Sequence, residues 1–282
     1  MVKFRNTGGG VSDNLEDRRA IGGRGLAAGG GIVGVIVVVL MQLLNSGGDG
    51  SGIDVNDVFN QINTGGSSGT VDPADEPLVE EMSDALDDVQ GFWATDEGIG
   101  ADYRDATLVL FTDAVSTGGC GNAPSSVGPF YCPADQTAYI DLAFFKQLQS
   151  QFDAPGDFAR VYVLAHELGH HVQNLLGTSG QVHEQQQSGA DANELSVRLE
   201  LQADCYAGIW GHSAQDRGLI EAGDIDEGLD AASAVGDDAL GNGDQESWTH
   251  GSSESRQRWF RAGFESGDLG ACDTFSVPAT DL

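Results

Sequence analysis

Basic side chains are scarce in this sequence of 282 residues. It has 13 lysines and arginines against 44 acidic residues, which leaves a formal net charge of −31. Only two of the basic residues are lysines, Lys3 and Lys146. Because so acidic a chain repels the phosphates of nucleic acids, we do not expect DNA or RNA to be its partner. Such a surface suits a high-salt environment, although genomic composition would produce the same bias.

Cysteine motifs of the usual metal-binding and redox kinds are also lacking. The four cysteines are Cys120, Cys132, Cys205 and Cys272, and no two of them form a C-x-x-C pair. This spacing argues against a zinc knuckle and against a thioredoxin-like site. An even number fits two disulfides if the domain lies in an oxidising compartment, and four buried thiols if it lies in the cytosol.

The longest uncharged stretch runs from Leu26 to Leu44 and contains one strongly polar side chain, Gln42. A helix of that length, rising about 1.5 Å per residue, nearly spans a hydrocarbon core of roughly 30 Å. Since no signal-peptide cleavage pattern follows, we expect residues 26–44 to be a single-pass transmembrane anchor. Five basic residues precede this stretch, and the next one after it is Arg104. The positive-inside rule then predicts a cytoplasmic N-terminus and an extracytoplasmic C-terminal part at the cell membrane.

That location favours disulfides over free thiols. Cys120 and Cys132 flank a turn region rich in Gly, Pro and Ser, so we expect them to be bridged. Cys205 and Cys272 would then tie a helix to the C-terminal tail.

Composition divides the chain into five segments. They are a cytoplasmic segment (1–25), the anchor (26–44), a flexible linker rich in Gly, Ser and Asp (45–76), a globular domain (77–275) and a tail (276–282). Hydrophobic periodicity within the globular domain indicates mostly helices. The helical stretches are 77–93, about 144–148, 158–176, 190–210, 225–240 and 252–264, and short strand-like runs occupy 107–111 and 137–142. The expected fold class is therefore α+β, a helix-rich domain with a small sheet, preceded by one transmembrane helix.

The segment HELGH, residues 166–170, carries the strongest chemical signal. Positions four apart lie on one face of a helix, so His166 and His170 can reach a single metal ion. Glu167 points to an adjacent position, where its carboxylate can take a proton from a metal-activated water. Buried histidines and a glutamate in so apolar a helix would be costly without such a partner.

Two histidines leave a tetrahedral zinc ion short of one protein ligand, because catalytic sites keep the fourth place for water. A later helix offers Glu200 and Asp204, again four apart. One carboxylate can bind zinc while the other accepts the free N–H of a ligand imidazole, and we favour Glu200 as the ligand. His183 is the rival, although the pattern H-E-x-x-H-x-x-G-x-x-H is not met. His171 should face away from His170, at the surface or behind the ligands.

These residues give the chain a family resemblance. H-E-x-x-H followed by E-x-x-x-D looks like the gluzincin arrangement, and the chain more closely resembles the bacterial predicted neutral zinc metallopeptidases, which are membrane-anchored. The matching stretches are LEDRR (15–19), CGNAPSSVGPFYCPADQTAYIDL (120–142), HELGHHVQNLLG (166–177), ELQADCYAGIW (200–210) and THGSSESRQRWF (249–260). The resemblance implies Zn²⁺, a zincin-like fold and peptidase activity.

The stretch THGSSESR adds a further expectation. It resembles the T-H-P-x-x-x-x-R element of membrane gluzincins of the CAAX-protease type, with Gly251 in place of the proline. By that likeness His250 would steady the oxyanion of the tetrahedral intermediate and Arg256 would brace the site. The plainer alternative is the capped start of a surface helix. Tyr131 and Tyr139 are weaker oxyanion candidates.

The resulting hypothesis is a zinc metalloendopeptidase that hydrolyses peptide bonds, with a peptide or protein as substrate and the membrane as its other partner. His166, His170 and Glu200 would hold zinc, and Glu167 would act as general base. An edge strand near Tyr139–Asp141 would pair with the substrate backbone. The alternative is a non-catalytic, zinc-containing binding or regulatory module for a cell-envelope partner.

Overall fold

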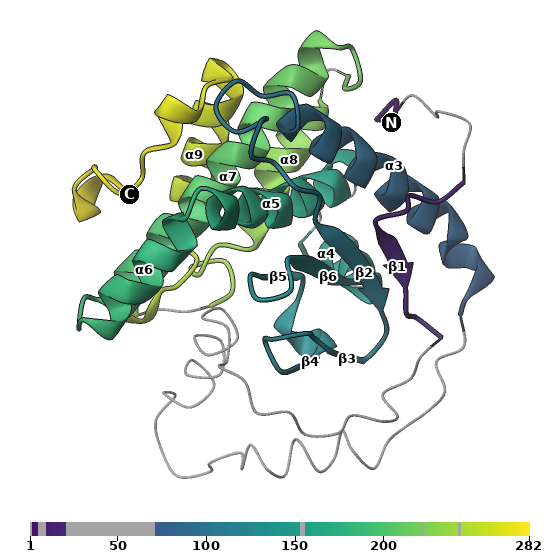
Figure 1. The fold of residues 1–282 in the computed structure, drawn as a ribbon, viewed down its shortest axis with the longest axis horizontal. Helices are drawn as coiled ribbons and strands as arrows, with labels where there is room; N and C mark the ends of the chain where they lie inside the picture. The colour runs from purple at the N-terminus through teal and green to yellow at the C-terminus, as the bar shows by residue number, and fades with distance from the viewer. Residues whose placement is uncertain (1, 5–9, 21–70, 153–155, 222, 242–243) are drawn as a thin grey trace.

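The computed structural model describes residues 2–4, 10–20, 71–152, 156–221, 223–241 and 244–282. Figure 1 shows a group of packed helices beside a small sheet. The helices are α3 (Glu76–Trp93), α4 (Ala143–Phe152), α5 (Asp157–Leu175), α6 (Thr178–Gln187), α7 (Ala192–Asp216), α8 (Asp224–Ala234) and α9 (Ser253–Ser266). Helix α5 is central, since it packs on α3, α7 and α8 and also contacts the sheet.

The helices follow the expected hydrophobic periodicity closely. Helix α5 ends at Leu175 because Gly177 takes a left-handed conformation, with φ of 80°, as the glycine after a helix commonly does. Helix α8 ends at Ala234, earlier than expected. Helix α6 was not expected at all, because its sequence is polar on every side and gives no apolar stripe to detect.

The main sheet has the strand order β1-β2-β6-β5. These strands are β1 (Leu15–Asp17), β2 (Thr107–Phe111), β5 (Phe130–Cys132) and β6 (Thr137–Asp141). The first three in sheet order are parallel, whereas β5 runs antiparallel to β6. A separate antiparallel pair consists of β3 (Ala114–Ser116) and β4 (Asn122–Pro124). The two strand runs predicted at 107–111 and 137–142 are thus confirmed as β2 and β6.

Strand β6 is nevertheless central rather than an edge. It is hydrogen-bonded to β2 on one side and to β5 on the other. Between Thr137 and Tyr139 both sides of β6 are therefore already paired, so β6 is not the edge strand that was expected to meet a substrate backbone.

The N-terminal segment is part of the same fold. Leu15 in β1 pairs with Leu108 in β2, and Arg19 just beyond β1 is buried. The Arg19 guanidinium is held by Asp17 at 2.7 Å and by Glu76, at the start of α3, at 2.8 Å. Residues 10–20 are consequently tied to both the sheet and the first helix of the globular domain.

This pairing corrects the predicted membrane topology. A single-pass anchor would place residues 1–25 and 77–275 on opposite sides of a membrane, yet β1 and β2 share hydrogen bonds in one sheet. In addition, none of the helices that the structure describes is long and apolar enough to cross a bilayer, because α5 and α7 carry charged residues such as Arg160 and Arg198 within their length. The transmembrane helix in the predicted fold class and the extracytoplasmic location are thus not supported. The stretch 26–44, on which the predicted anchor falls, lies outside the described residues.

Close helix packing joins α7 to α9. A Cβ atom at Gly208 would lie 2.1 Å from the carbonyl oxygen of Phe260, and one at Gly263 would lie 1.9 Å from that of Cys205. Only glycine fits at such distances, so these two residues allow the helix backbones to touch. The close approach holds α9, which carries Arg256, against α7, which carries Glu200.

Both predicted disulfides are present. Cys120 and Cys132 are bridged with their Cα atoms 5.9 Å apart, which fastens the loop before β4 to the end of β5. Cys205 on α7 is bridged to Cys272, with Cα atoms 5.6 Å apart. The second bridge holds the C-terminal segment against α7, as expected.

Candidate metal centre

Two histidine side chains leave α5 on the same face, one helical turn apart. The rings of His166 and His170 are buried, with centroids 4.8 Å apart and planes nearly perpendicular. Both present Nε2 towards α7, so two imidazole nitrogens converge on one point.

A glycine allows α7 to reach that point. A Cβ atom at Gly169, between the two histidines in sequence, would lie 2.9 Å from the carbonyl oxygen of Ala203 on α7. With no side chain in the way, α7 brings Glu200 to 3.2 Å from His166 Nε2 and to 3.4 Å from His170 Nε2. The three candidate ligand atoms all lie within 4.8 Å of one another.

This donor set fits zinc. Two imidazole nitrogens and one carboxylate oxygen are a common protein contribution to a catalytic zinc ion. Burial would raise the pKa of Glu200, but the neighbouring rings of His170 and His166 hold it well below its ordinary value. Glu200 is therefore anionic, as a ligand must be.

Glu167 lies next to this group and has an unusual environment. Its side chain is 6% exposed, and its Oε2 atom is buried with no hydrogen-bond partner among the residues that the structure describes. Burial raises the pKa of this carboxyl group, and the nearby histidines only partly offset that effect. A buried carboxylate oxygen without a partner is expensive unless something binds there.

Asp204 anchors His166 from behind. Its Oδ1 atom is 2.8 Å from His166 Nδ1 and accepts a hydrogen bond of 2.5 Å from the Tyr162 hydroxyl. Arg256 holds the same carboxylate with two N–H groups, at 2.8 and 2.9 Å. Burial would lower the pKa of His166, but the charge and hydrogen bond of Asp204, with Glu200, raise it to about 10. The structure thus brings Asp204 and Arg256 together behind His166.

His250 sits in a turn that an unpredicted residue organises. Asp237 Oδ2 accepts three consecutive backbone N–H groups, those of Thr249, His250 and Gly251, at 2.7 to 3.0 Å. Its Oδ1 atom lies 3.4 Å from His250 Nδ1. The turn packs on α7 beside Val197 and Leu201, which flank Glu200 in sequence.

The same turn explains why residue 251 is glycine rather than proline. Gly251 has φ of 87° and donates its N–H to Asp237. Proline has no N–H and keeps φ near −65°, so it fits neither requirement. Glycine replaces the proline of the T-H-P pattern because this turn is held together by hydrogen bonds to Asp237.

The other candidates have partners of their own. Tyr131 bonds His171 Nδ1 at 2.8 Å, and Tyr139 donates to Asp135 at 2.8 Å, so neither hydroxyl is left for an oxyanion. His171 is fully buried rather than at the surface, and it donates from Nε2 to the carbonyl of Arg104 at 2.6 Å. His183 lies on α6 beside Gln187 and is not part of the converging group.

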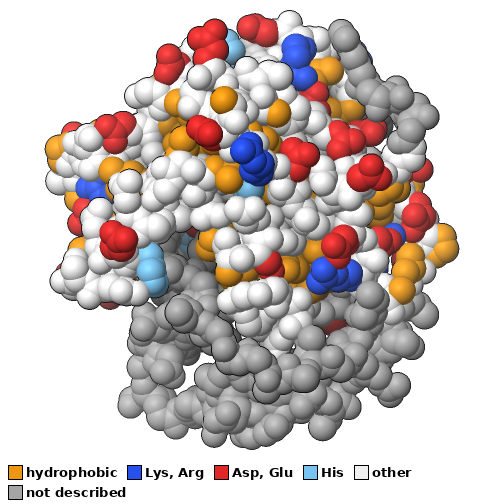
Figure 2. Space-filling model, in the orientation of Figure 1, with side chains coloured by type: hydrophobic (Ala, Val, Ile, Leu, Met, Phe, Trp, Pro, Cys, Tyr) orange, Lys and Arg blue, Asp and Glu red, His pale blue; other side chains and the backbone are white. Residues whose placement is uncertain are grey.

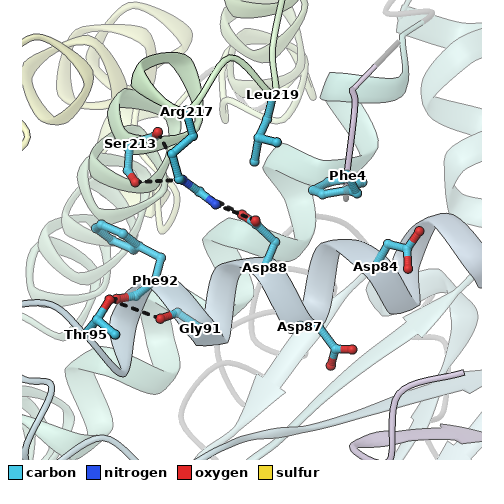
Figure 3. Close-up of a pocket in the computed structure, with 10 residues that line it drawn as sticks. All are labelled: Phe4, Asp84, Asp87, Asp88, Gly91, Phe92, Thr95, Ser213, Arg217 and Leu219. Carbon is cyan, nitrogen blue, oxygen red and sulfur yellow. Dashed lines mark hydrogen bonds and ion pairs between the residues drawn. The ribbon is translucent and has the colours of Figure 1, made fainter. Parts of the chain in front are cut away.

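Acidic side chains outnumber basic ones on the visible surface. Figure 2 shows Asp and Glu spread across one face of the molecule, with only a few Lys and Arg among them. A separate pocket of about 460 Å³ opens between α3 and the end of α7, where Asp88 accepts hydrogen bonds from Arg217 (Figure 3). Asp88 also accepts a hydrogen bond from Trp210. It is lined by Phe4, Asp84, Asp87, Asp88, Gly91, Phe92, Thr95, Ser213, Arg217 and Leu219. None of the metal-site residues lines it.

A two-histidine, one-glutamate cluster on adjacent helices of an α+β fold, with a glutamate beside it, is typical of zinc hydrolases. A family model described as "Putative neutral zinc metallopeptidase" matches residues 3–275. The chain belongs to this family, whose description supports a zinc-dependent hydrolase and implies zinc as its metal.

Relatives extend over most of the chain. It is 42% identical over 279 residues to the "Uncharacterized protein YpfJ" of Escherichia coli (strain K12), covering 94% of this chain and 96% of that protein. It is 48% identical over 196 residues to the "Uncharacterized protein Rv2575" of Mycobacterium tuberculosis (strain H37Rv), and the match covers 64% of this chain and 65% of that protein. No solved structure matches the chain.

Proposed function

We propose that this protein hydrolyses peptide bonds with a zinc ion held by His166, His170 and Glu200. The observation that carries the proposal is the convergence of these three ligand atoms beside a buried, unpartnered oxygen of Glu167. Zinc, when bound, supplies Lewis-acid chemistry that polarises a peptide carbonyl and makes water acidic enough to attack near neutral pH. The substrate would be a peptide or protein.

Glu167 moves the proton in this scheme. Burial raises the pKa of its carboxyl group towards the working pH, which is the condition for an efficient general base. It accepts a proton from the attacking water and passes it to the nitrogen of the leaving amine. The free Oε2 atom is the atom available for that transfer, because no described residue occupies it.

His250 and Arg256 complete the site in different ways. His250 would donate from its ring to the negatively charged oxygen that develops on the substrate carbonyl. Asp237 lies at Nδ1, which leaves Nε2 as the ring atom for the substrate, and Nε2 can donate there when both ring nitrogens carry hydrogen. Arg256 instead acts through Asp204, whose carboxylate keeps the His166 ring oriented with Nε2 towards Glu200.

The test compares Glu167→Gln with wild type and with Glu184→Gln, an exposed glutamate on α6 that serves as the control. Each purified protein is assayed for zinc content and for cleavage of a broad peptide library followed by mass spectrometry. Glu167→Gln should keep one zinc per chain and lose at least about 10²-fold in hydrolysis, the usual scale for a general base. Glu184→Gln should behave as wild type.

Two results would count against the proposal. If Glu167→Gln cleaves peptides as fast as wild type, Glu167 is not the base. If wild type binds zinc but cleaves nothing in the library, a non-catalytic zinc-containing module becomes the better description.

A further inference from the structure

A row of buried side-chain amides leads away from the second histidine of the metal centre. Gln173, one turn after His170 on α5, places its Oε1 atom 2.8 Å from His170 Nδ1. Its Nε2 atom donates to the carbonyl of Leu199 at 2.7 Å and to Gln202 Oε1 at 3.1 Å. Gln202 then donates from Nε2 to the carbonyl of Cys272 at 3.0 Å.

Both ends of this row determine the direction of donation. A backbone carbonyl can only accept, so the amide nitrogen of Gln173 must face Leu199, and that of Gln202 must face Cys272. With its nitrogen committed, Gln173 can offer only its oxygen to His170. The ring of His170 therefore carries its hydrogen on Nδ1.

That assignment has a direct consequence at the metal centre. A neutral imidazole with hydrogen on Nδ1 has its lone pair on Nε2. Nε2 is the atom that lies 3.4 Å from Glu200 and belongs to the converging group. The amide row thus selects the tautomer of His170 that can bind a metal ion.

The two histidines are supported by different chemistry. His166 donates to a carboxylate, Asp204, which Arg256 neutralises. His170 donates to a neutral amide. The support behind His170 therefore adds no charge to a site that already buries Glu167 and Glu200.

The far end of the row is firmly held. Cys272 is bridged to Cys205 on α7, and Thr274 donates from its hydroxyl to the carbonyl of Arg198 at 2.7 Å. Arg198 in turn donates to the carbonyl of Val277 at 3.0 Å. The C-terminal segment is therefore fastened to α7 on both sides of the carbonyl that Gln202 uses.

We propose that Gln173 and Gln202 are positioning residues for the metal centre: they form a polar relay, anchored on the Cys272 carbonyl, that holds His170 in its metal-binding tautomer and orientation. The proposal rests on the proposed function only in taking His170 as a zinc ligand. It does not depend on peptide hydrolysis.

Zinc affinity provides the first test. Metal-free full-length proteins are titrated with zinc against a chromophoric chelator. Gln173→Leu should weaken zinc binding by about 10- to 100-fold, the usual effect of losing a partner behind a ligand histidine. Gln202→Leu should weaken it less, because Gln173 keeps its bond to Leu199.

Two further variants separate positioning from simple packing. Gln173→Glu retains an oxygen for His170 Nδ1, so its zinc affinity should lie nearer to wild type than that of Gln173→Leu. Gln90→Leu is the matched control, since Gln90 is an equally buried glutamine on α3 that bonds the backbone of Ala106 instead. Gln90→Leu should bind zinc like wild type.

The second test reads the tautomer without metal. In ¹⁵N NMR spectra of the metal-free protein at alkaline pH, His170 should show a protonated Nδ1 and an unprotonated Nε2. Gln173→Leu should shift these signals towards a mixture of tautomers, whereas Gln90→Leu should not. If Gln173→Leu keeps both the tautomer and the wild-type zinc affinity, the relay has no positioning role, and the proposed peptidase function would stand without it.

Discussion

The buried charge pair behind His166 allows a quantitative prediction. Asp204 is fully buried, and Arg256 gives it two N–H groups at 2.8 and 2.9 Å. Arg256→Met keeps an unbranched apolar stem of similar length but removes the guanidinium. Asp204 would then keep only its contacts with Tyr162 and His166.

The expected loss of stability is large because the Asp204 carboxylate stays buried without its arginine partner. Removing one partner of a buried ion pair typically costs about 3–5 kcal/mol, since the remaining charge stays away from water. For a domain of this size each kcal/mol lowers the melting temperature by roughly 2–4 °C, so Arg256→Met should lower it by about 6–20 °C. Adding Asp204→Asn to Arg256→Met removes the stranded charge and should restore part of that loss.

The measurements are thermal unfolding for the melting temperature and chemical unfolding for the free energy, both on the metal-free proteins because bound zinc would add its own stabilisation. Arg258→Met is the control, since Arg258 is exposed on the same helix and bonds the carbonyl of Asp281. Its cost should stay below about 1 kcal/mol. If Arg256→Met is no worse than Arg258→Met, or if Asp204→Asn only adds a further loss, the account of the buried pair is wrong.

Three other predictions follow from single contacts. Replacing Cys205 and Cys272 together by alanine should cost about 4 kcal/mol in urea unfolding, because their bridge closes a loop with a sequence separation of 67. Burial raises the pKa of Asp237, but hydrogen bonds from the His250 ring and from backbone N–H groups hold it below its ordinary 3.8. Its stabilisation is therefore present above about pH 4 and lost as the pH falls through the folded-state pKa, so Asp237→Asn should cost about 1.5–3 kcal/mol at pH 7 and progressively less below pH 4. Glu200→Ala should lose most of the zinc measured by metal analysis, whereas His183→Ala should retain it. The opposite pattern would mean that His183, and not Glu200, is the third ligand.

Much of the candidate centre could be read from sequence because its key spacings are local. A helix brings residues four apart onto one face whatever surrounds it, so His166 and His170 could be paired on spacing alone. The same rule linked Glu200 to Asp204. Apolar runs likewise predicted β2 and β6, since strands that are buried on both faces carry mostly apolar side chains.

Helical spacing and apolar runs could not predict contacts between segments that are distant in the sequence. Asp237 organises the turn at His250 from 13 residues away, and no periodicity connects them. The separation is 29 residues between Gln173 and Gln202, and 70 between Gln202 and Cys272. The sequence alone cannot distinguish a buried glutamine from a surface glutamine, because only the packing shows what surrounds the side chain.

The N-terminal segment shows the same limit most clearly. Its basic residues suggested a cytoplasmic flank, but Leu15 is buried in a sheet and Arg19 in an ion-pair cluster. A strand of three residues is too short to detect from alternating hydrophobicity. Its stability comes from pairing with β2, a segment that is distant in the sequence. The sequence by itself therefore determined which residues share one helix face in the candidate centre, through helical spacing. The tertiary structure decided how α7 reaches α5 past Gly169, which groups orient each histidine, and which segments share a sheet, because these depend on backbone approach between parts of the chain far apart in sequence.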